Sequence, residues 1–219
     1  MQERKSHLVQ HALENQRQPG EHTPLKDPSW SYVNTRKLDD FSREDWALLG
    51  RQRQPYEIEE RPKQALEMLI AQQDIPSFGY QINNYQHCLQ SATKAMEDGQ
   101  DDETIVVALF HDVGFMVCND THGAFSAELL RPYVHDKHIW TLQRHMYFQF
   151  KHLPTVDGID HDFRDRWRNH DYYDWAASFV EKYDIEAMNA DFTNAPLEEF
   201  IPIVNRVFAK SRQPICPPE

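Results

Sequence analysis

The adjacent residues His111 and Asp112 are the part of the sequence best suited to chemistry. They follow the almost wholly apolar segment 105–110, which is expected to be a buried helix. Two ionisable groups at such a place cost on the order of several kcal/mol unless something compensates them, and a metal ion does so efficiently. We therefore expect His111 and Asp112 to be metal ligands.

The geometry of a helix indicates how many ions such a pair serves. Neighbouring residues on a helix point about 100 degrees apart, so His111 and Asp112 do not easily share one tetrahedral site. A carboxylate has two oxygens and can bridge two ions, which favours a dinuclear site. Further ligands must then come from other helices, and three histidines in or beside segments with an apolar face are candidates: His87, His122 and His145.

The elements that must position these residues are predicted to be helices. Ser42, with Asp45 three residues later, is expected to cap a helix to about residue 53, and Pro62 to begin another that ends near residue 73. Asp102 is expected to cap the apolar run that Gly114 ends. Further helices are predicted over residues 85–98, 104–113, 122–133, 137–150, 172–183 and 196–209. No convincing pair of strands appears, so the fold class is all-α.

The length of 219 residues favours a single domain with extensions. Residues 1–40 are polar and rich in turn formers, which predicts an N-terminal extension. Residues 41–78 are expected to form N-terminal helices that pack on the core, 79–209 the main domain, and 210–219 a C-terminal tail.

Composition excludes several classes of protein. Hydrophobic residues make up 40% of the chain, too many for a disordered protein, and no apolar stretch is long enough to span a bilayer. The chain has 23 basic and 35 acidic residues, and this net charge of −12 disfavours nucleic acid as a partner. Three scattered cysteines and an N-terminus without a secretory apolar region predict a cytoplasmic protein with reduced thiols.

The ordered pattern of His87, the segment 107–114 (VALFHDVG), His122, His145 and a late Asp resembles the HD-domain superfamily of metal-dependent hydrolases and oxygenases. The resemblance covers about residues 79–208. Within the superfamily, residues 80–92 and 179–200 are most similar to the small di-iron oxygenases that cleave organophosphonates, which are relatives of myo-inositol oxygenase.

The resemblance implies an HD-domain helical bundle with two iron ions at its centre. His87, His111 and Asp184 would hold one iron, His122 and His145 the other, and Asp112 would bridge them; Asp171 and Asp174 are alternatives to Asp184. The implied reaction uses O2 to remove hydrogen from a carbon that bears a hydroxyl in a small-molecule substrate. Asp112, Tyr80 and Lys151 are the expected catalytic residues.

Two positions depart from the phosphonate enzymes. Phe115 stands where the characterised oxygenases are basic, and Glu181 where the phosphonate enzymes carry Arg. Because Glu181 and Asp184 are three residues apart, they would share a helix face, and an acidic group would point toward the metals. We therefore expect an uncharged polyol-like or amine-bearing substrate. Tyr80 and Ser77 lie near the substrate-gating positions of the oxygenases, but in a different register.

Other residues were assigned from their local sequence. Tyr147, Lys151 and His152 are expected to reach the substrate, with solvated helix-end residues as the alternative. Trp140, Phe148 and Phe150 are expected in the core or a pocket wall. The acidic stretch 97–103 lacks the spacing of an EF-hand and is interpreted as a solvated turn. The remaining histidines in polar surroundings are expected to be solvated: His7, His11, His22, His135, His138, His161 and His170.

Two alternatives to an oxygenase stay open. The same ligands, loaded with Mn2+, would suit a phosphohydrolase in which a metal-bound hydroxide attacks phosphorus. A regulatory module that keeps the metals only as a structural staple is the other, although degenerate members of that kind are expected to lose ligands. The sequence does not predict the oligomeric state.

Overall fold

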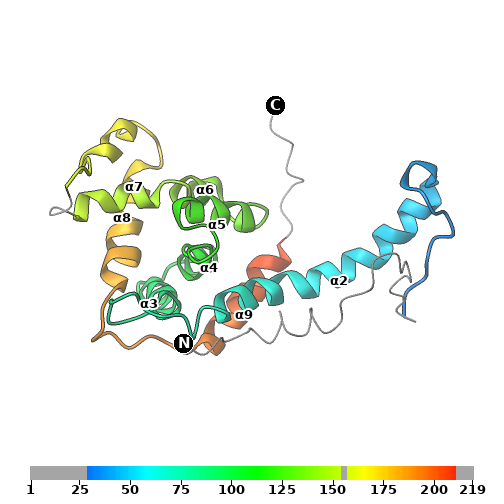
Figure 1. Ribbon diagram of the computed structural model, residues 1–219, viewed down its shortest axis with the longest axis horizontal. Helices are drawn as coiled ribbons and strands as arrows, with labels where there is room; N and C mark the ends of the chain where they lie inside the picture. Colours follow the sequence, from blue (N-terminus) through cyan, green and yellow to red (C-terminus); the bar gives the residue numbers. More distant parts are fainter. Residues whose placement is uncertain (1–28, 154–156, 211–219) are drawn as a thin grey trace. The chain divides into compact units, whose positions relative to one another are not determined.

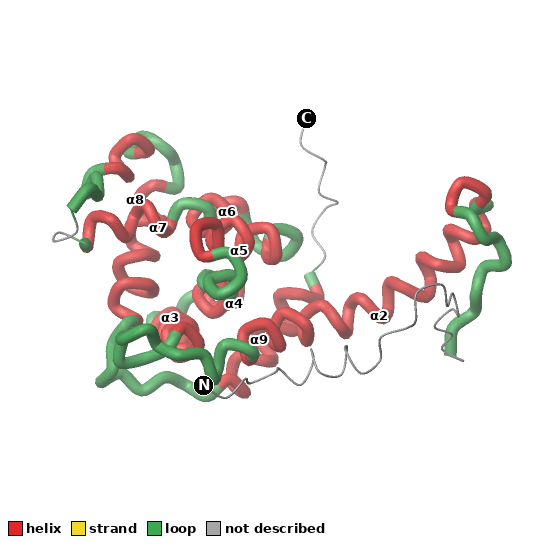
Figure 2. Tube along the Cα trace, viewed as in Figure 1, coloured by secondary structure: helices red, strands yellow, loops and turns green. Residues whose placement is uncertain are grey.

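The structure of the chain, a computed structural model, describes residues 29–153 and 157–210. Within these residues every regular element is a helix (Figure 1; Figure 2), which confirms the all-α prediction. None of the described helices combines the length and apolar character needed to cross a bilayer. The chain divides into two compact units, Met1–Gln54 and Pro55–Glu219. Most of the predicted N-terminal extension and nearly all of the C-terminal tail lie outside the described residues.

The described part of the first unit contains η1 (Leu38–Asp40) and the beginning of α2 (Arg43–Ile70). The Asp45 amide donates to Ser42 Oγ at 3.1 Å, and the Ser42 amide donates to Asp45 Oδ2 at 3.0 Å. This reciprocal arrangement satisfies two backbone donors that the helix itself leaves free. The prediction that Ser42 and Asp45 begin a helix is therefore confirmed.

The predicted division of residues 42–73 into two helices is wrong, because Pro55 and Pro62 both lie inside α2. A proline within a helix removes the hydrogen bond to the carbonyl four residues earlier. For Pro62 that carbonyl belongs to Ile58, which is exposed, so water can bind to it. The helix then continues to Ile70, where Ala65, Leu66 and Leu69 are buried in the core of the second unit.

The second unit is built around α4 (Asp102–Phe110), whose residues from Thr104 to Phe110 are all buried. α3, α6 and α9 pack against it, and α5 and α8 pack against α6 (Figure 1). The other α-helices are α3 (Asn84–Glu97), α5 (His122–Leu130), α6 (Asp136–Leu142), α7 (His145–Gln149), α8 (Tyr173–Phe179) and α9 (Leu197–Ala209). Shorter helices are η2 (Asn119–Thr121), η3 (Phe150–His152), η4 (Phe163–Trp167), the π-helix η5 (Val180–Asp184) and η6 (Ile185–Ala187).

Side-chain caps fix where α3 and α4 begin. Asn83 accepts from the Gln86 amide, and the Gln86 side chain accepts from the Asn83 amide, so α3 starts with a capping box. At α4 the cap is Asp101, whose Oδ1 accepts from the Thr104 amide at 2.8 Å. The prediction of Asp102 as the cap is thus wrong by one residue, because Asp102 instead pairs with Arg206 of α9.

Several predicted helices end earlier than expected. α4 ends at Phe110 rather than Val113, because side-chain amides bind the next carbonyls: Asn84 donates to Asp112 O, and Gln72 donates to Val113 O. The predicted helix 137–150 is two helices, and the backbone of Arg144 between them is not helical. Arg144 lies over the rings of Trp140 and Trp167, a contact that this break allows. α5 ends three residues before Tyr133, and α8 changes to the π-helix after Phe179.

Replacing Asp101 with Ala is expected to lower the free energy of unfolding by about 1 kcal/mol, because the Thr104 amide loses its acceptor. The measurement is denaturant unfolding. Asp102→Ala is the matched control: the ion pair with Arg206 lies at the surface, and its loss should cost less than about 0.5 kcal/mol. Equal losses in the two variants would contradict the assignment of Asp101 as the cap.

Candidate metal centre

The structure brings together all six side chains that the sequence nominated as metal ligands, and all six are buried. They form two groups of three, His87 with His111 and Asp184, and Asp112 with His122 and His145. In each group the potential ligand atoms lie within 4.8 Å of one another. This is the grouping that the resemblance implied, whereas metal binding itself stays a prediction.

Every one of the six lies at or near the end of a helix. His87 is in the first turn of α3, His122 begins α5, and His145 begins α7. His111 and Asp112 directly follow α4, and Asp184 ends η5. The ligands are therefore positioned by helix ends, several of which the sequence analysis did not predict. Because a continuous helix from 137 to 150 would give Arg144 a helical backbone, the break at that residue sets where His145 points.

Backbone carbonyls orient three of the four imidazoles in the same way. Nδ1 of His111, His122 and His145 lies 2.8, 2.6 and 2.8 Å from the carbonyl oxygen three residues earlier. For His87, the carbonyl is that of Ala187, at 3.4 Å. A carbonyl only accepts, so Nδ1 carries a proton, and in the neutral imidazole Nε2 keeps the lone pair that a metal ion needs. Such a second hydrogen bond is what fixes the ring of a metal-binding histidine.

The four Nε2 atoms then face one another in pairs. His87 Nε2 lies 3.0 Å from His111 Nε2, and His122 Nε2 lies 2.9 Å from His145 Nε2. Two lone pairs this close repel unless a proton or a metal ion lies near both. An ion bound by two imidazoles at about 2.1 Å, at right angles, would place their nitrogens about 3.0 Å apart. The spacing of both pairs thus fits a metal ion.

Asp112 lies between the two histidine pairs. Its Oδ1 is 3.0 Å from His122 Nε2 and 3.2 Å from His145 Nε2, and its Oδ2 is 3.7 Å from His87 Nε2. Oδ1 therefore faces His122 and His145 and lies 3.6 Å from His111 Nε2, while Oδ2 faces His87, so the carboxylate contacts both pairs. This is the arrangement required of a carboxylate that bridges two ions.

The carboxylates stay ionised despite their burial. Burial raises the pKa of Asp112, but the charge of His111 and hydrogen bonds from His122 and His145 outweigh it and hold the pKa well below its usual range. The pKa of Asp184 is lowered in the same way by His111 and His87. The pKa of His111 is raised in return. Burial lowers it, but the charge of Asp112 and the hydrogen bond with Asp184 outweigh this effect. Metal ions bind to deprotonated ligands, so their binding here would be coupled to the release of protons.

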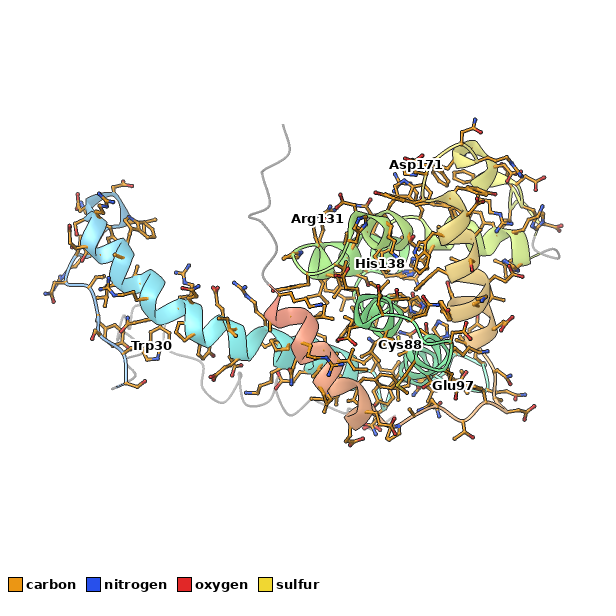
Figure 3. The ribbon with its side chains drawn as sticks, turned by 180° about the vertical axis from the view of Figure 1, so that it is seen from behind. Trp30, Cys88, Glu97, Arg131, His138 and Asp171 are labelled. Carbon is orange, nitrogen blue, oxygen red and sulfur yellow. The ribbon has the colours of Figure 1, made fainter. Side chains whose placement is uncertain are left out.

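Asp184 is held by a residue that the sequence reasoning missed. Gln149 donates from Nε2 to Asp184 Oδ2 at 2.7 Å, while Asp184 Oδ1 faces His87 at 3.5 Å. The amide thus occupies one carboxylate oxygen and leaves the other for a metal. The alternatives Asp171 and Asp174 are both exposed, and Asp171 lies at the outer edge of the unit (Figure 3).

The donor atoms indicate which metals fit. Burial, followed by the charge of Asp112, raises the pKa of the Cys88 thiol well above its usual value, so Cys88 is no thiolate ligand. Imidazole nitrogens and carboxylate oxygens without sulfur suit iron, manganese or zinc. Four imidazoles with two carboxylates thus fit the expected pair of iron ions by ligand chemistry.

A cavity of about 290 Å³ opens onto this cluster. Its volume is at the small end of the range found for ligand pockets. His87, Asp112, His122 and Asp184 form its floor with Asn84, Asn119 and Gln149 beside them. The walls are mostly apolar and comprise Phe78, Tyr80, Ile82, Phe115, Met146, Leu153, Ile185 and Met188, together with Ser77.

Of the predicted substrate residues, only Tyr80 lines the cavity, and it is 62% exposed at the mouth. Tyr147 stacks on Phe163, and Lys151 pairs with Asp162 at 2.6 Å. His152 is half-buried outside the cavity. These three side chains are not among the described residues that line the cavity, and their contact with a substrate stays a prediction.

Glu181 does not point in the same direction as Asp184, since Glu181 is exposed while Asp184 is buried. The two lie in the π-helix η5, whose turn is wider than that of an α-helix. Residues three apart consequently no longer share a face. The structural basis for an amine-bearing substrate is therefore lost.

One histidine predicted to be solvated is in the core. His138 is fully buried in α6 and meets the ring of Trp175 edge-on, with ring centroids 5.5 Å apart (Figure 3). Its neighbours Lys137 and Gln143 gave the segment a polar appearance. His135 and His170 are exposed and His161 is half-buried, while His7, His11 and His22 lie outside the described residues.

Gly123 is a further residue whose role is visible only in the structure. A methyl group at this position would collide with the carbonyl oxygen of Leu142 and lie 3.0 Å from the ring of His145. The lack of a side chain therefore lets α5 approach the end of α6 and the ligand that follows it. In the sequence, the one sign of this role is that Gly123 directly follows the predicted ligand His122.

A scan against protein-family models finds no match for this chain, and a search of the curated proteins finds none either. The resemblance to the HD-domain superfamily therefore rests on the sequence pattern alone and stays a prediction.

Replacing Gln149 with Leu is expected to weaken iron binding by roughly 10- to 100-fold, because Asp184 loses the donor that orients it. Metal titration followed by calorimetry measures this. Gln143→Leu, the same change at an exposed position, should bind iron as the unaltered protein does. Unchanged affinity in Gln149→Leu would show that Asp184 needs no such orientation.

Gly123→Ala is expected to lower the free energy of unfolding by about 1–3 kcal/mol, since the backbone of Leu142 cannot yield as a flexible side chain would. It should also reduce the bound metal through the displaced His145. Gly50→Ala in α2, where nothing lies within 4 Å, should leave both unchanged or raise stability slightly. Chemical unfolding and metal analysis of both variants measure these effects. A Gly123→Ala variant as stable and as rich in metal as Gly50→Ala would contradict the close contact between Gly123 and Leu142.

Proposed function

We propose that this chain is an HD-domain di-iron oxygenase that uses O2 to oxidise or cleave a small, uncharged, hydroxylated organic molecule. The observation that carries the proposal is the arrangement of four imidazoles around Asp112. Within each of two pairs, His87 with His111 and His122 with His145, the Nε2 atoms face each other at 3.0 and 2.9 Å. The order of these ligands along the chain is the order seen in HD-domain proteins. Free thiols at Cys88 and Cys118 favour a reducing compartment such as the cytoplasm.

The residues present would divide the two ions between them. His87, His111 and Asp184 would hold one iron, His122 and His145 the other, and Asp112 both. Bound there, the iron pair would supply the one-electron and O2 chemistry that side chains lack. The protein contributes ligands of fixed tautomer, through the four carbonyls that accept from Nδ1.

The cavity accounts for binding and for the exclusion of water. Phe115 lies edge-on to His122, with ring centroids 5.7 Å apart, so an apolar wall stands directly beside the metal ligands. Tyr80 at the mouth can offer its hydroxyl to a substrate that enters. Water displaced from these walls strengthens every electrostatic interaction within the site.

A phosphohydrolase would use the same ligands, but the cavity disfavours it. No Lys or Arg occurs among the described residues that line it. A phosphate ester would therefore meet the two carboxylates without a cation from the protein. Lys151, the cation that the sequence predicted near the substrate, forms an ion pair with Asp162 instead. A purely structural role for the metals does not explain why a cavity reaches them.

Anaerobic reconstitution with iron(II) is expected to load two iron ions per chain, and oxidation by one electron per chain with ferricyanide should then give a mixed-valent electron paramagnetic resonance signal that a bound substrate perturbs. His111→Gln should lose this signal, because one ion loses a ligand from the cluster. His170→Gln, at an exposed position stacked on Trp140, should keep it. Phosphate release with Mn2+ and no oxygen uptake would instead establish the hydrolase.

A further inference from the structure

We propose that the substrate bound beside this centre is an alcohol with an apolar body and a single hydroxyl-bearing end, rather than a polyol. The inference rests on the proposed function and narrows its substrate class. It follows from what the walls of the cavity consist of and from how the polar groups near the ligands are used.

The walls present carbon and sulfur on more than one side of the centre. Phe115 stands by His122, and Ile185 directly follows the ligand Asp184. Met146 and Met188, whose flexible thioether side chains adapt to irregular apolar shapes, complete the lining with Phe78. Apolar surface of this kind binds apolar surface, because both are removed from water.

Two of the three amide side chains beside the ligands, those of Asn84 and Gln149, already donate to partners within the protein. Asn84 Nδ2 donates to Gln72 Oε1 at 2.7 Å and to the carbonyl of Asp112 at 3.0 Å. Gln149 Nε2 donates to Asp184. At Asn119 the backbone carbonyl lies 2.6 Å from Nδ1 of His122, whereas the exposed side chain lines the cavity. The amide donors of Asn84 and Gln149 therefore serve the metal ligands, which leaves few polar groups of the lining for a bound molecule.

A molecule with many hydroxyls would meet too few polar partners in this cavity. Each hydroxyl moved from water against an apolar wall without a hydrogen bond is unfavourable. A single hydroxyl directed at the metal centre avoids this, and the rest of the molecule can lie against Phe115, Ile185 and the methionines. The walls thereby select against polyols and against charged molecules.

The mouth of the cavity supports the same conclusion. Phe78, Tyr80 and Met188 line it and are 63%, 62% and 41% exposed. Phe78 is held at a φ of +55°, a conformation that costs a non-glycine residue energy, beside Gly79 at +103°. Large apolar side chains displayed at a cavity mouth are covered when an apolar ligand enters.

The test compares two ligands of the same ring size, cyclohexanol and inositol, which carry one and six hydroxyls. Ligand-detected NMR titration of the iron-loaded protein, kept anaerobic, gives both affinities. Cyclohexanol is expected to bind at least about tenfold more tightly. Tighter binding of inositol, or equal affinities, would overturn the inference.

A matched pair of variants locates the binding. Met188→Gln and Met116→Gln make the same change at positions 41% and 43% exposed, but only Met188 lines the cavity. Met188→Gln should weaken cyclohexanol binding by roughly fivefold, and Met116→Gln should leave it unchanged. Equal effects of the two substitutions would place the alcohol elsewhere and overturn the inference.

Failure of the proposed function gives a different result. One outcome is that cyclohexanol binds selectively and Met188→Gln abolishes this binding, but no alcohol causes oxygen uptake. This result would refute the oxygenase and leave the apolar selectivity intact. Oxygen uptake that depends on polyols alone would uphold the oxygenase and refute the selectivity.

Discussion

The second unit of this protein depends on the balance of charge within one buried cluster. Two carboxylates and four imidazoles are buried, so water solvates them poorly, and an isolated charge among them would be strongly unfavourable. The cluster is stable because opposite charges are supplied inside it, by protons on the imidazoles or by metal ions. Everything that surrounds the cluster either orients these groups or keeps solvent away from them.

Orientation comes from the ends of helices rather than from their middles. At a helix end the backbone carbonyls lack partners within the helix, so they are available to accept from an imidazole. His111, His122 and His145 each use the carbonyl three residues earlier in this way. The same contact satisfies the carbonyl and fixes the tautomer, so local helix termination and ligand chemistry support each other. The side-chain amides of Asn84 and Gln149 extend this arrangement to the turn after α4 and to Asp184.

The apolar wall next to the cluster explains how a strongly acidic chain can present a site for an uncharged molecule. The net charge of −12 is spread over the surface, whereas Phe115, Ile185 and the two methionines line the space above the ligands. No Lys or Arg is among the described residues that line this space, and Lys151 is paired with Asp162. Under the proposed function, a substrate would be selected by its fit to the walls and by one oxygen at the centre.

The residues of the cluster were recognisable in the sequence because His111 and Asp112 interrupt an apolar helix, and only a compensating partner makes that tolerable. The all-α class and the Ser42 cap were equally visible, since helical spacing and capping are local properties. Glu181, Lys151 and His152 could not be placed from sequence, because η3, η4 and the π-helix depend on contacts between distant segments. Likewise, Gly123 and Gln149 acquire their roles only through neighbours, Leu142 and Asp184, that the tertiary structure brings to them. Local patterns thus determined which groups need compensation, and the packing of helices decided where they point.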